Sequence, residues 1–256
     1  MFKKFFLNYF YVFSLGAISS YSLPPYNYFI INFITFSLFF IFLFNKKKQI
    51  LKNKSFFKYG WCFGFGYFLF SLYWIVISLT FDQSFKFLIP IAIIILPAFL
   101  AKFYGLITYL FSIFYSKNIV SSFFIFSILF GTIEFIRGSV LTGFPWNLIS
   151  FSFSNSIYFI QILSIIGTYS FNLICITLFT LPALFILRKS RTEIVVCLFF
   201  ILVSIGFLIF GYIKNNNFNY LKSVKKSYTI KAISSNISLD RFYSKQDELK
   251  IINELI

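Results

Sequence analysis

Glu134 and Arg137 are the ionisable pair in this sequence best placed to do chemistry. They are three positions apart near the end of an apolar stretch, so on a helix they lie on one face. Ionisable residues at membrane depth are costly and mark a pathway or an internal ion pair. Two interpretations stay open. Either the side chains satisfy each other at the outer interface, or Arg137 also binds an anionic lipid headgroup, which its planar fork suits.

The segment directly after this pair, Thr142-Gly143-Phe144-Pro145-Trp146-Asn147, predicts an interfacial turn. Gly and Pro break the helix, while the aromatic residues favour the membrane–water boundary. In a functional interpretation, the turn walls an entrance through which a lipid tail reaches a site outside the membrane. The candidate residues for lipid or substrate access are therefore Glu134, Arg137, Phe144 and Trp146.

The remaining reactive side chains predict no catalytic residue, no metal site and no cofactor. The sequence has no His, which excludes Ser-His-Asp triads, Cys-His pairs and His-containing zinc sites. Cys62, Cys175 and Cys197 fall in apolar segments without a cationic neighbour that would favour the thiolate, so we expect small apolar residues. The carboxylates near the C-terminal end are interpreted as ordinary solvated charges; they are Asp240, Asp247, Glu248 and Glu254.

Composition indicates that membrane helices position these residues. Of the 256 residues, 59% are hydrophobic, 25% aromatic and only 12% charged, against about 25% charged in an average soluble protein. So little polar surface cannot coat a water-soluble globule. The net charge is +16, but Lys and Arg stand in short clusters between apolar runs, as in cytoplasmic loops. A basic nucleic-acid-binding face is therefore excluded, and no nucleic-acid partner is expected.

We predict an all-α polytopic membrane protein with about seven transmembrane helices, because a span needs about 20 largely apolar residues. The segments are Phe5–Tyr21, Tyr28–Phe44, Phe56–Leu79, Phe87–Tyr115, Ile119–Ile136, Ser156–Leu187 and Ile194–Ile213. Met1 to Leu23 also fits a signal peptide, with Ala17-Ile18-Ser19 as its cleavage site, and this alternative stays open.

Three details within the spans carry further expectations. Gly60 and Gly64 permit close contact of the third span with another helix. Prolines at 90, 97 and 182 predict kinks or interfacial turns in the fourth and sixth spans. Lys102 is expected to snorkel toward the membrane surface, with a polar interior as the alternative.

The positive charges predict a cytoplasmic N-terminus in a bacterial inner membrane. With that orientation, the outside connections before the C-terminal segment hold only Lys86 and Arg137, which is a strong bias under the positive-inside rule. The inside segments hold Lys3, Lys4, Lys46, Lys47, Lys48, Lys52, Lys54, Lys58, Lys117, Arg188, Lys189 and Arg191. Seven spans then place the C-terminal tail in the periplasm.

The predicted domain organisation has three parts. Residues 1–213 form the transmembrane bundle, 214–227 a polar linker, and 228–256 the start of an incomplete extracytoplasmic α/β domain. Tyr228–Ser234 has the residue types and rough alternation of a strand. A capping-box-like start at Ser244 then opens an amphipathic helix.

Four stretches resemble the apolipoprotein N-acyltransferase family, and their spacing fits from about residue 10 onward. The most specific is Glu134 and Arg137 followed by Thr142–Trp146, which matches an E-x-x-R…T-G-F-P-W motif. The others are Ser22-Leu23-Pro24-Pro25 after the first span, Gly60–Tyr67 with Leu72-Tyr73-Trp74, and Gln161 with Ile166–Ser170, where Ser170 replaces the usual Gly.

The resemblance implies a membrane bundle that supports a nitrilase-like domain outside the inner membrane. In the family, a Glu-Lys-Cys triad takes an acyl chain from a phospholipid as a thioester. It then passes the chain to the α-amino group of the diacylglyceryl-Cys of a lipoprotein. Ser235-Asn236-Ile237 resembles the end of the first nitrilase strand, with Ser234 in place of the frequent Gln. The triad is expected beyond Ile256, so these residues alone are not expected to catalyse.

Several alternatives stay open. The sequence is expected to be the first half of a split gene, a degraded remnant, or a membrane subunit complemented by a separately encoded nitrilase-like half. In a different class stands a transporter or lipid-translocating protein, which needs no nucleophile but usually shows internal repeats and mid-span charges. A purely structural membrane subunit is the third class.

Overall fold

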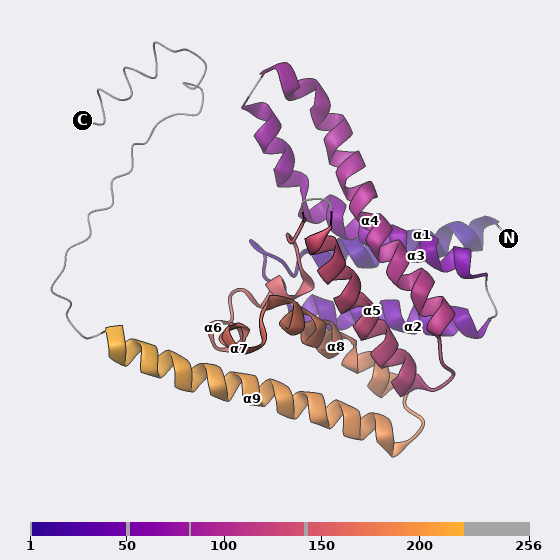
Figure 1. Ribbon diagram of the computed structural model, residues 1–256. Coiled ribbons are helices and arrows are strands. Elements are labelled where there is room, and N and C mark those ends of the chain that lie inside the picture. The colour runs from indigo at the N-terminus through magenta and orange to yellow at the C-terminus, as the bar shows by residue number, and fades with distance from the viewer. Residues whose placement is uncertain (1, 50–51, 82, 141–142, 223–256) are drawn as a thin grey trace, which may run out of the picture.

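The computed structural model describes residues 2–49, 52–81, 83–140 and 143–222, and these ranges are all helices and connections, without a strand. Figure 1 shows the arrangement. The elements are α1 (Phe2–Ser20), α2 (Ile30–Lys48), α3 (Asn53–Ser71), η1 (Tyr73–Thr80), η2 (Gln83–Leu88), α4 (Ile89–Phe114), α5 (Ile119–Ser139), η3 (Ile149–Phe153), α6 (Ile157–Ile160), α7 (Leu163–Ile166), α8 (Thr168–Ile186) and α9 (Arg191–Lys222). The three η segments are short 3-10 helices.

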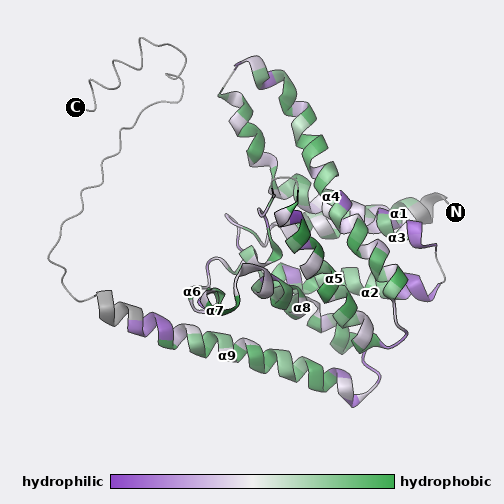
Figure 2. Cartoon of the chain, in the orientation of Figure 1, coloured by the Kyte–Doolittle hydropathy of each residue, from purple (hydrophilic) through white to green (hydrophobic). Residues whose placement is uncertain are grey.

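Five helices within the described ranges are long and apolar enough to cross a membrane, or six if one bent pair forms a single span. The five are Ile30–Lys48, Gln83–Phe114, Ile119–Ser139, Thr168–Ile186 and Arg191–Asn217, and the bent pair is Asn53–Ser71 with Tyr73–Thr80. Figure 2 shows α9 as apolar along its middle and hydrophilic at both ends, the pattern of a helix that spans a bilayer. A multi-pass helical membrane protein is therefore confirmed.

Three of the spans expected from the sequence have a different form in the structure. α1 is helical, but its Lys, Asn and Ser residues leave it less apolar than the spans above. The third segment bends by 48° where α3 ends and the 3-10 helix η1 begins. The sixth is broken into α6, α7 and α8, and Gly167, which has a φ of 75°, separates α7 from α8. Only α8 is long enough to span.

α3 is the central helix on one side of the bundle, and it packs most extensively against α4 and α1. A Cβ at Gly60 would lie 2.2 Å from the carbonyl oxygen of Tyr104, and one at Gly64 would lie 3.1 Å from the Cα of Ala101. The two helix backbones therefore approach closely at both positions. The predicted contact through small residues is confirmed, with α4 as the partner helix.

Stacked and edge-to-face Phe rings fill the middle of the bundle. Phe39 of α2 lies 4.2 Å from Phe63 of α3 with the rings 11° from parallel, and Phe126 and Phe130 of α5 lie 5.0 Å apart. All four side chains are fully buried. These rings join α2, α3 and α5 without any polar group.

Pro97 and Pro182 lie inside α4 and α8, while Pro90 lies in the first turn of α4, where a missing N–H costs nothing. Beside Pro182, the hydroxyl of Ser37 in α2 accepts from the backbone N–H of Ala183 at 3.1 Å and donates to the carbonyl oxygen of Phe179 at 3.1 Å. The hydroxyl thus joins the backbone groups on either side of the proline and ties α2 to α8.

The last helix extends past the predicted end of the last span. α9 continues to Lys222 as one helix, beyond the expected end at Ile213 and into the proposed linker. The strand at Tyr228–Ser234, the segment Ser235-Asn236-Ile237, the helix from Ser244 and the four C-terminal carboxylates lie outside the described residues.

Candidate functional site

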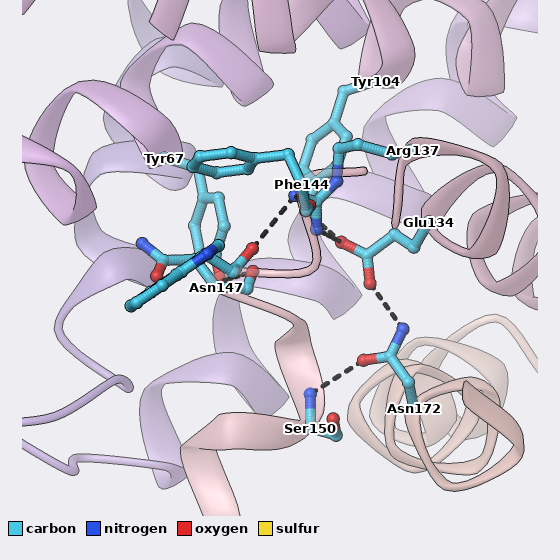
Figure 3. Close-up of polar contacts among 9 residues, drawn as sticks. Tyr67, Tyr104, Glu134, Arg137, Phe144, Asn147, Ser150 and Asn172 are labelled. Carbon is cyan, nitrogen blue, oxygen red and sulfur yellow. Dashed lines mark hydrogen bonds and ion pairs between the residues drawn. The ribbon is translucent and has the colours of Figure 1, made fainter. Parts of the chain in front are cut away.

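The side chains of Glu134 and Arg137 meet inside the bundle, on one face of the last turns of α5 (Figure 3). Nη2 of Arg137 lies 3.5 Å from Oε1 of Glu134, and both side chains are fully buried. The ion pair described by the first of the two interpretations is present. The guanidinium faces protein atoms on several sides.

The carboxylate of Glu134 is the centre of a buried hydrogen-bond network. Oε1 accepts from the hydroxyl of Tyr104 in α4 at 2.7 Å, and Oε2 accepts from the amide of Asn172 in α8. The amide oxygen of Asn172 in turn accepts from the backbone N–H of Ser150 at 2.8 Å. A buried charge is tolerated only when it is paired and hydrogen-bonded, and here the partners come from three elements, α4, α5 and α8.

Arg137 holds the loop that follows α5. Its Nη1 donates to the carbonyl oxygens of Phe144 at 2.8 Å and of Trp146 at 3.0 Å. The guanidinium carbon also lies 5.3 Å from the centroid of the Phe68 ring of α3, a cation–π distance. One planar group therefore binds a carboxylate, two carbonyls and a ring, which an ammonium group of the same charge could not match.

The loop itself has a fixed backbone. Gly143 has a φ of 79°, and a Cβ there would meet the carbonyl oxygen of Gly138 at 2.5 Å. Asn147 also has a positive φ, 55°, and its amide donates to the carbonyl oxygen of Ser71 at 3.0 Å. The hydroxyl of Tyr67 donates to the carbonyl oxygen of Asn147 at 3.0 Å. The loop is therefore anchored from α5 on one side and from α3 on the other.

This anchoring directs the two aromatic side chains differently. Phe144 is partly buried and packs against the core, whereas Trp146 is 53% exposed. The ring of Trp146 lies 5.3 Å from that of Trp74 in η1. The aromatic turn predicted from the sequence is present. It contacts Trp74, which belongs to the motif formed by Gly60–Tyr67 and Leu72-Tyr73-Trp74.

A cavity of about 380 Å³ opens beside the two tryptophans. It is lined by Leu23, Pro24, Ser71, Trp74, Trp146, Asn147, Phe151 and Ser154. Its apolar walls, with a few hydroxyl and amide groups, resemble those of sites that bind a partly apolar ligand. Three of the four sequence motifs contribute residues to this wall, although they are far apart in the chain.

A second buried polar cluster holds the Leu23-Pro24 side of the cavity. Asn32 of α2 accepts from the hydroxyl of Ser19 at 2.6 Å and donates to that of Ser22 at 2.8 Å. The hydroxyl of Ser22 donates to the carbonyl oxygen of Ser19 at 2.8 Å. These bonds fix the turn between α1 and α2, and all three side chains are buried.

Sequence reasoning did not assign Tyr104, Asn172 or Asn32 to the site, and it named Tyr67 only as the end of the Gly60–Tyr67 motif. The available signal was the same in each case, a polar group within an otherwise apolar helix, where its hydrogen bonds must be made internally. The hydrogen-bond partner of each side chain could not be predicted from the sequence, because the partners lie on other elements of the fold.

The other reactive side chains stay outside this site. Cys175 and Cys197 are buried and Cys62 is partly buried, all as free thiols. Lys102 is exposed, with its ammonium 5.2 Å from the Phe99 ring centroid, so it does not face a polar interior. Within the described ranges, His, Cys, Asp and Glu form no cluster that would hold a metal ion.

The helices are apolar enough to span a membrane, and they enclose a buried polar network next to an aromatic loop. These features define the class of polytopic helical membrane proteins with a site at one end of the bundle. Comparison with known proteins narrows this class. The family model described as apolipoprotein N-acyltransferase N-terminal domain matches residues 15–181. The chain belongs to the apolipoprotein N-acyltransferase family through this domain.

Comparison with individual proteins supports the same family. The chain is similar to the apolipoprotein N-acyltransferase of Rhizobium etli, with 32% identity over 200 residues that cover 75% of this chain and 37% of the relative. For the Brucella melitensis protein of the same name the identity is 30% over 204 residues, covering 75% and 37%. For Rhodopseudomonas palustris it is 33% over 187 residues, covering 70% and 33%. The chain thus spans about a third of the length of these relatives.

Proposed function

We propose that this chain is the membrane portion of an apolipoprotein N-acyltransferase. The reaction is transfer of an acyl chain from a phospholipid to the α-amino group of the N-terminal diacylglyceryl-Cys of a lipoprotein. The triad that performs it belongs to a nitrilase-like domain, carried on the same polypeptide or on a separate one. Glu134, Arg137, Phe144 and Trp146 form the access site for the lipid or the lipoprotein at the foot of that domain.

The cavity beside Trp146 carries the proposal. Residues from three motifs of the family resemblance line this cavity. The loop that carries Trp146 is held by the buried Arg137, which donates hydrogen bonds to two of its carbonyl oxygens. In this arrangement Arg137 and Glu134 are positioning residues, Phe144 seats the loop on the core, and Trp146 lies where an acyl chain would pass.

The proposed topology has seven spans in the bacterial inner membrane, and it counts α1 and the bent α3–η1 segment as one span each. The N-terminus then lies in the cytoplasm and the residues after α9 lie in the periplasm. The asymmetry of Lys and Arg supports it. A reporter that is active only outside the cytoplasm should be active when fused at Ile256. A stably produced but inactive fusion would reverse the orientation.

The activity is tested with the chain alone and with a completed protein, in which a nitrilase-like domain carrying the Glu-Lys-Cys triad is joined to it. Radiolabelled phospholipid and a diacylated lipopeptide are supplied in detergent micelles, and the product is analysed by mass spectrometry. The completed protein should transfer the acyl chain, whereas the chain alone should not. A hydroxylamine-sensitive acyl label on Cys62, Cys175 or Cys197 of the chain alone would contradict the proposal.

A further inference from the structure

Two apolar grooves lie side by side near the start of α3, at the lysine-rich end of the bundle. One, of about 490 Å³, is lined by Tyr9, Phe57, Lys58, Trp61 and Cys62. The other, of about 520 Å³, is lined by Lys54, Phe57, Lys58, Leu106 and Tyr109. Both volumes fall in the range of about 300–1,000 Å³ that is typical of small-molecule sites. Figure 2 shows hydrophilic residues gathered where α2 ends and α3 begins.

Phe57 is the ridge between the two grooves, because it lines both of them. Its ring packs against Gly105 of α4, where a Cβ would lie only 2.9 Å from the ring atom Cε2. The ridge is therefore fixed by the close approach of α3 and α4. Lys58 also borders both grooves, so its charge is shared between them.

Lys54 and Lys58 present two positive charges at the mouth of this double groove. They are one helical turn apart on the same face of α3, and both are exposed. The one ion pair among the described residues is that of Arg137 with Glu134, so neither lysine is neutralised by a carboxylate there. Their aliphatic stems can lie along the grooves while the ammonium groups reach the membrane surface.

We infer that this surface binds an anionic phospholipid. The phosphate of the headgroup lies between Lys54 and Lys58, and the two acyl chains follow the two grooves on either side of Phe57. A soluble phosphate would use the charges but not the apolar walls, and a zwitterionic lipid would use the walls but gain less from the charges. The site lies at the opposite end of α3 from Ser71 and Trp74, so it is separate from the access site beside Trp146 and does not depend on its function.

Trp61 makes the site measurable, because it lines one groove only three residues beyond Lys58. The full chain carrying Trp74→Phe and Trp146→Phe, which leaves Trp61 as its single tryptophan, is reconstituted in phosphatidylcholine vesicles. Phosphatidylglycerol or phosphatidylcholine with bromines near the upper acyl chain is then titrated in, and quenching of the Trp61 fluorescence is recorded. A lysine near an anionic lipid gives about a fivefold preference, so two should give about 25-fold tighter binding of the brominated phosphatidylglycerol.

Three variants complete the test. Lys54→Gln with Lys58→Gln should remove the preference, and Lys54→Arg with Lys58→Arg should retain it. Lys117→Gln with Lys189→Gln is the matched control, since it removes the same charge from exposed lysines that line neither groove, and it should leave the preference unchanged. Equal quenching by both lipids in the unsubstituted site, or an equal loss in the control pair, would overturn the inference. Competition by glycerol phosphate as strong as that by the lipid would also overturn it.

Discussion

The middle of the bundle and its Glu134 end are held together in different ways. In the middle, Phe39 and Phe63 stack at 4.2 Å, and their contacts have no preferred donor or acceptor. At the end, Glu134 and Arg137 bind Tyr104, Asn172 and backbone carbonyls through directed bonds. Lipid tails are as apolar as Phe, so the rings gain mainly van der Waals contact in a membrane. The middle therefore sets the shape of the bundle, while the polar end fixes where a single loop lies.

Glu134→Ala should have the largest effect on stability. It leaves the buried guanidinium of Arg137 without its carboxylate, and breaking one side of a buried pair costs about 3–5 kcal/mol. The free energy of unfolding, measured by denaturation with SDS in mixed micelles, should fall by that amount. Adding Arg137→Met should recover part of the loss. A single variant as stable as the parent would show that the pair does not bear on the fold.

Arg137→Lys should reduce acyl transfer more than it reduces protein abundance. Lys keeps the charge but loses the fork that binds the carbonyls of Phe144 and Trp146 together. Loss of one charge-assisted hydrogen bond corresponds to roughly a tenfold or larger fall in kcat/KM of the completed protein. If turnover is unchanged while Arg137→Ala and Glu134→Gln only lower expression, the pair is purely structural.

Trp146→Ala should act on the substrate rather than on the fold. Loss of an aromatic contact is worth about 0.5–1.5 kcal/mol, so KM for the phospholipid or the lipopeptide should rise about two- to tenfold. Tyr73→Ala is the matched control. Tyr73, in η1, is an exposed aromatic residue like Trp146, but it does not line the cavity. Equal effects of the two substitutions would remove the cavity from the access route.

Phe39→Leu should have the smallest effect of these four substitutions. It changes the shape of a ring in the middle while keeping an apolar side chain of similar volume, which costs less than about 1.5 kcal/mol. KM and kcat of the completed protein should stay within about twofold. A change in KM as large as that of Trp146→Ala would mean that the middle and the polar end are coupled.

The features that could be predicted from the sequence depend on local patterns. Apolar runs located α2, α4, α5 and α9, and helical spacing placed Glu134 beside Arg137. The bend after Ser71 could not be predicted in this way, because Tyr73–Thr80 is as apolar as a continuing span. The partners of Glu134 were equally hidden, since Tyr104 and Asn172 are 30 and 38 positions away and only packing brings them together.

The bridge that Ser37 makes beside Pro182 has a consequence for how this chain can change over generations. With the proline present, Ser37→Ala would leave the N–H of Ala183 and the carbonyl of Phe179 without their shared hydroxyl, so that step is unfavourable. Once Pro182→Ala has restored the helical N–H, α8 can close its own bonds and the serine becomes dispensable. The two replacements are therefore tolerated when Pro182 changes first and unfavourable when Ser37 changes first. The residue present at position 182 of α8 thus determines which residues are allowed at position 37 of α2.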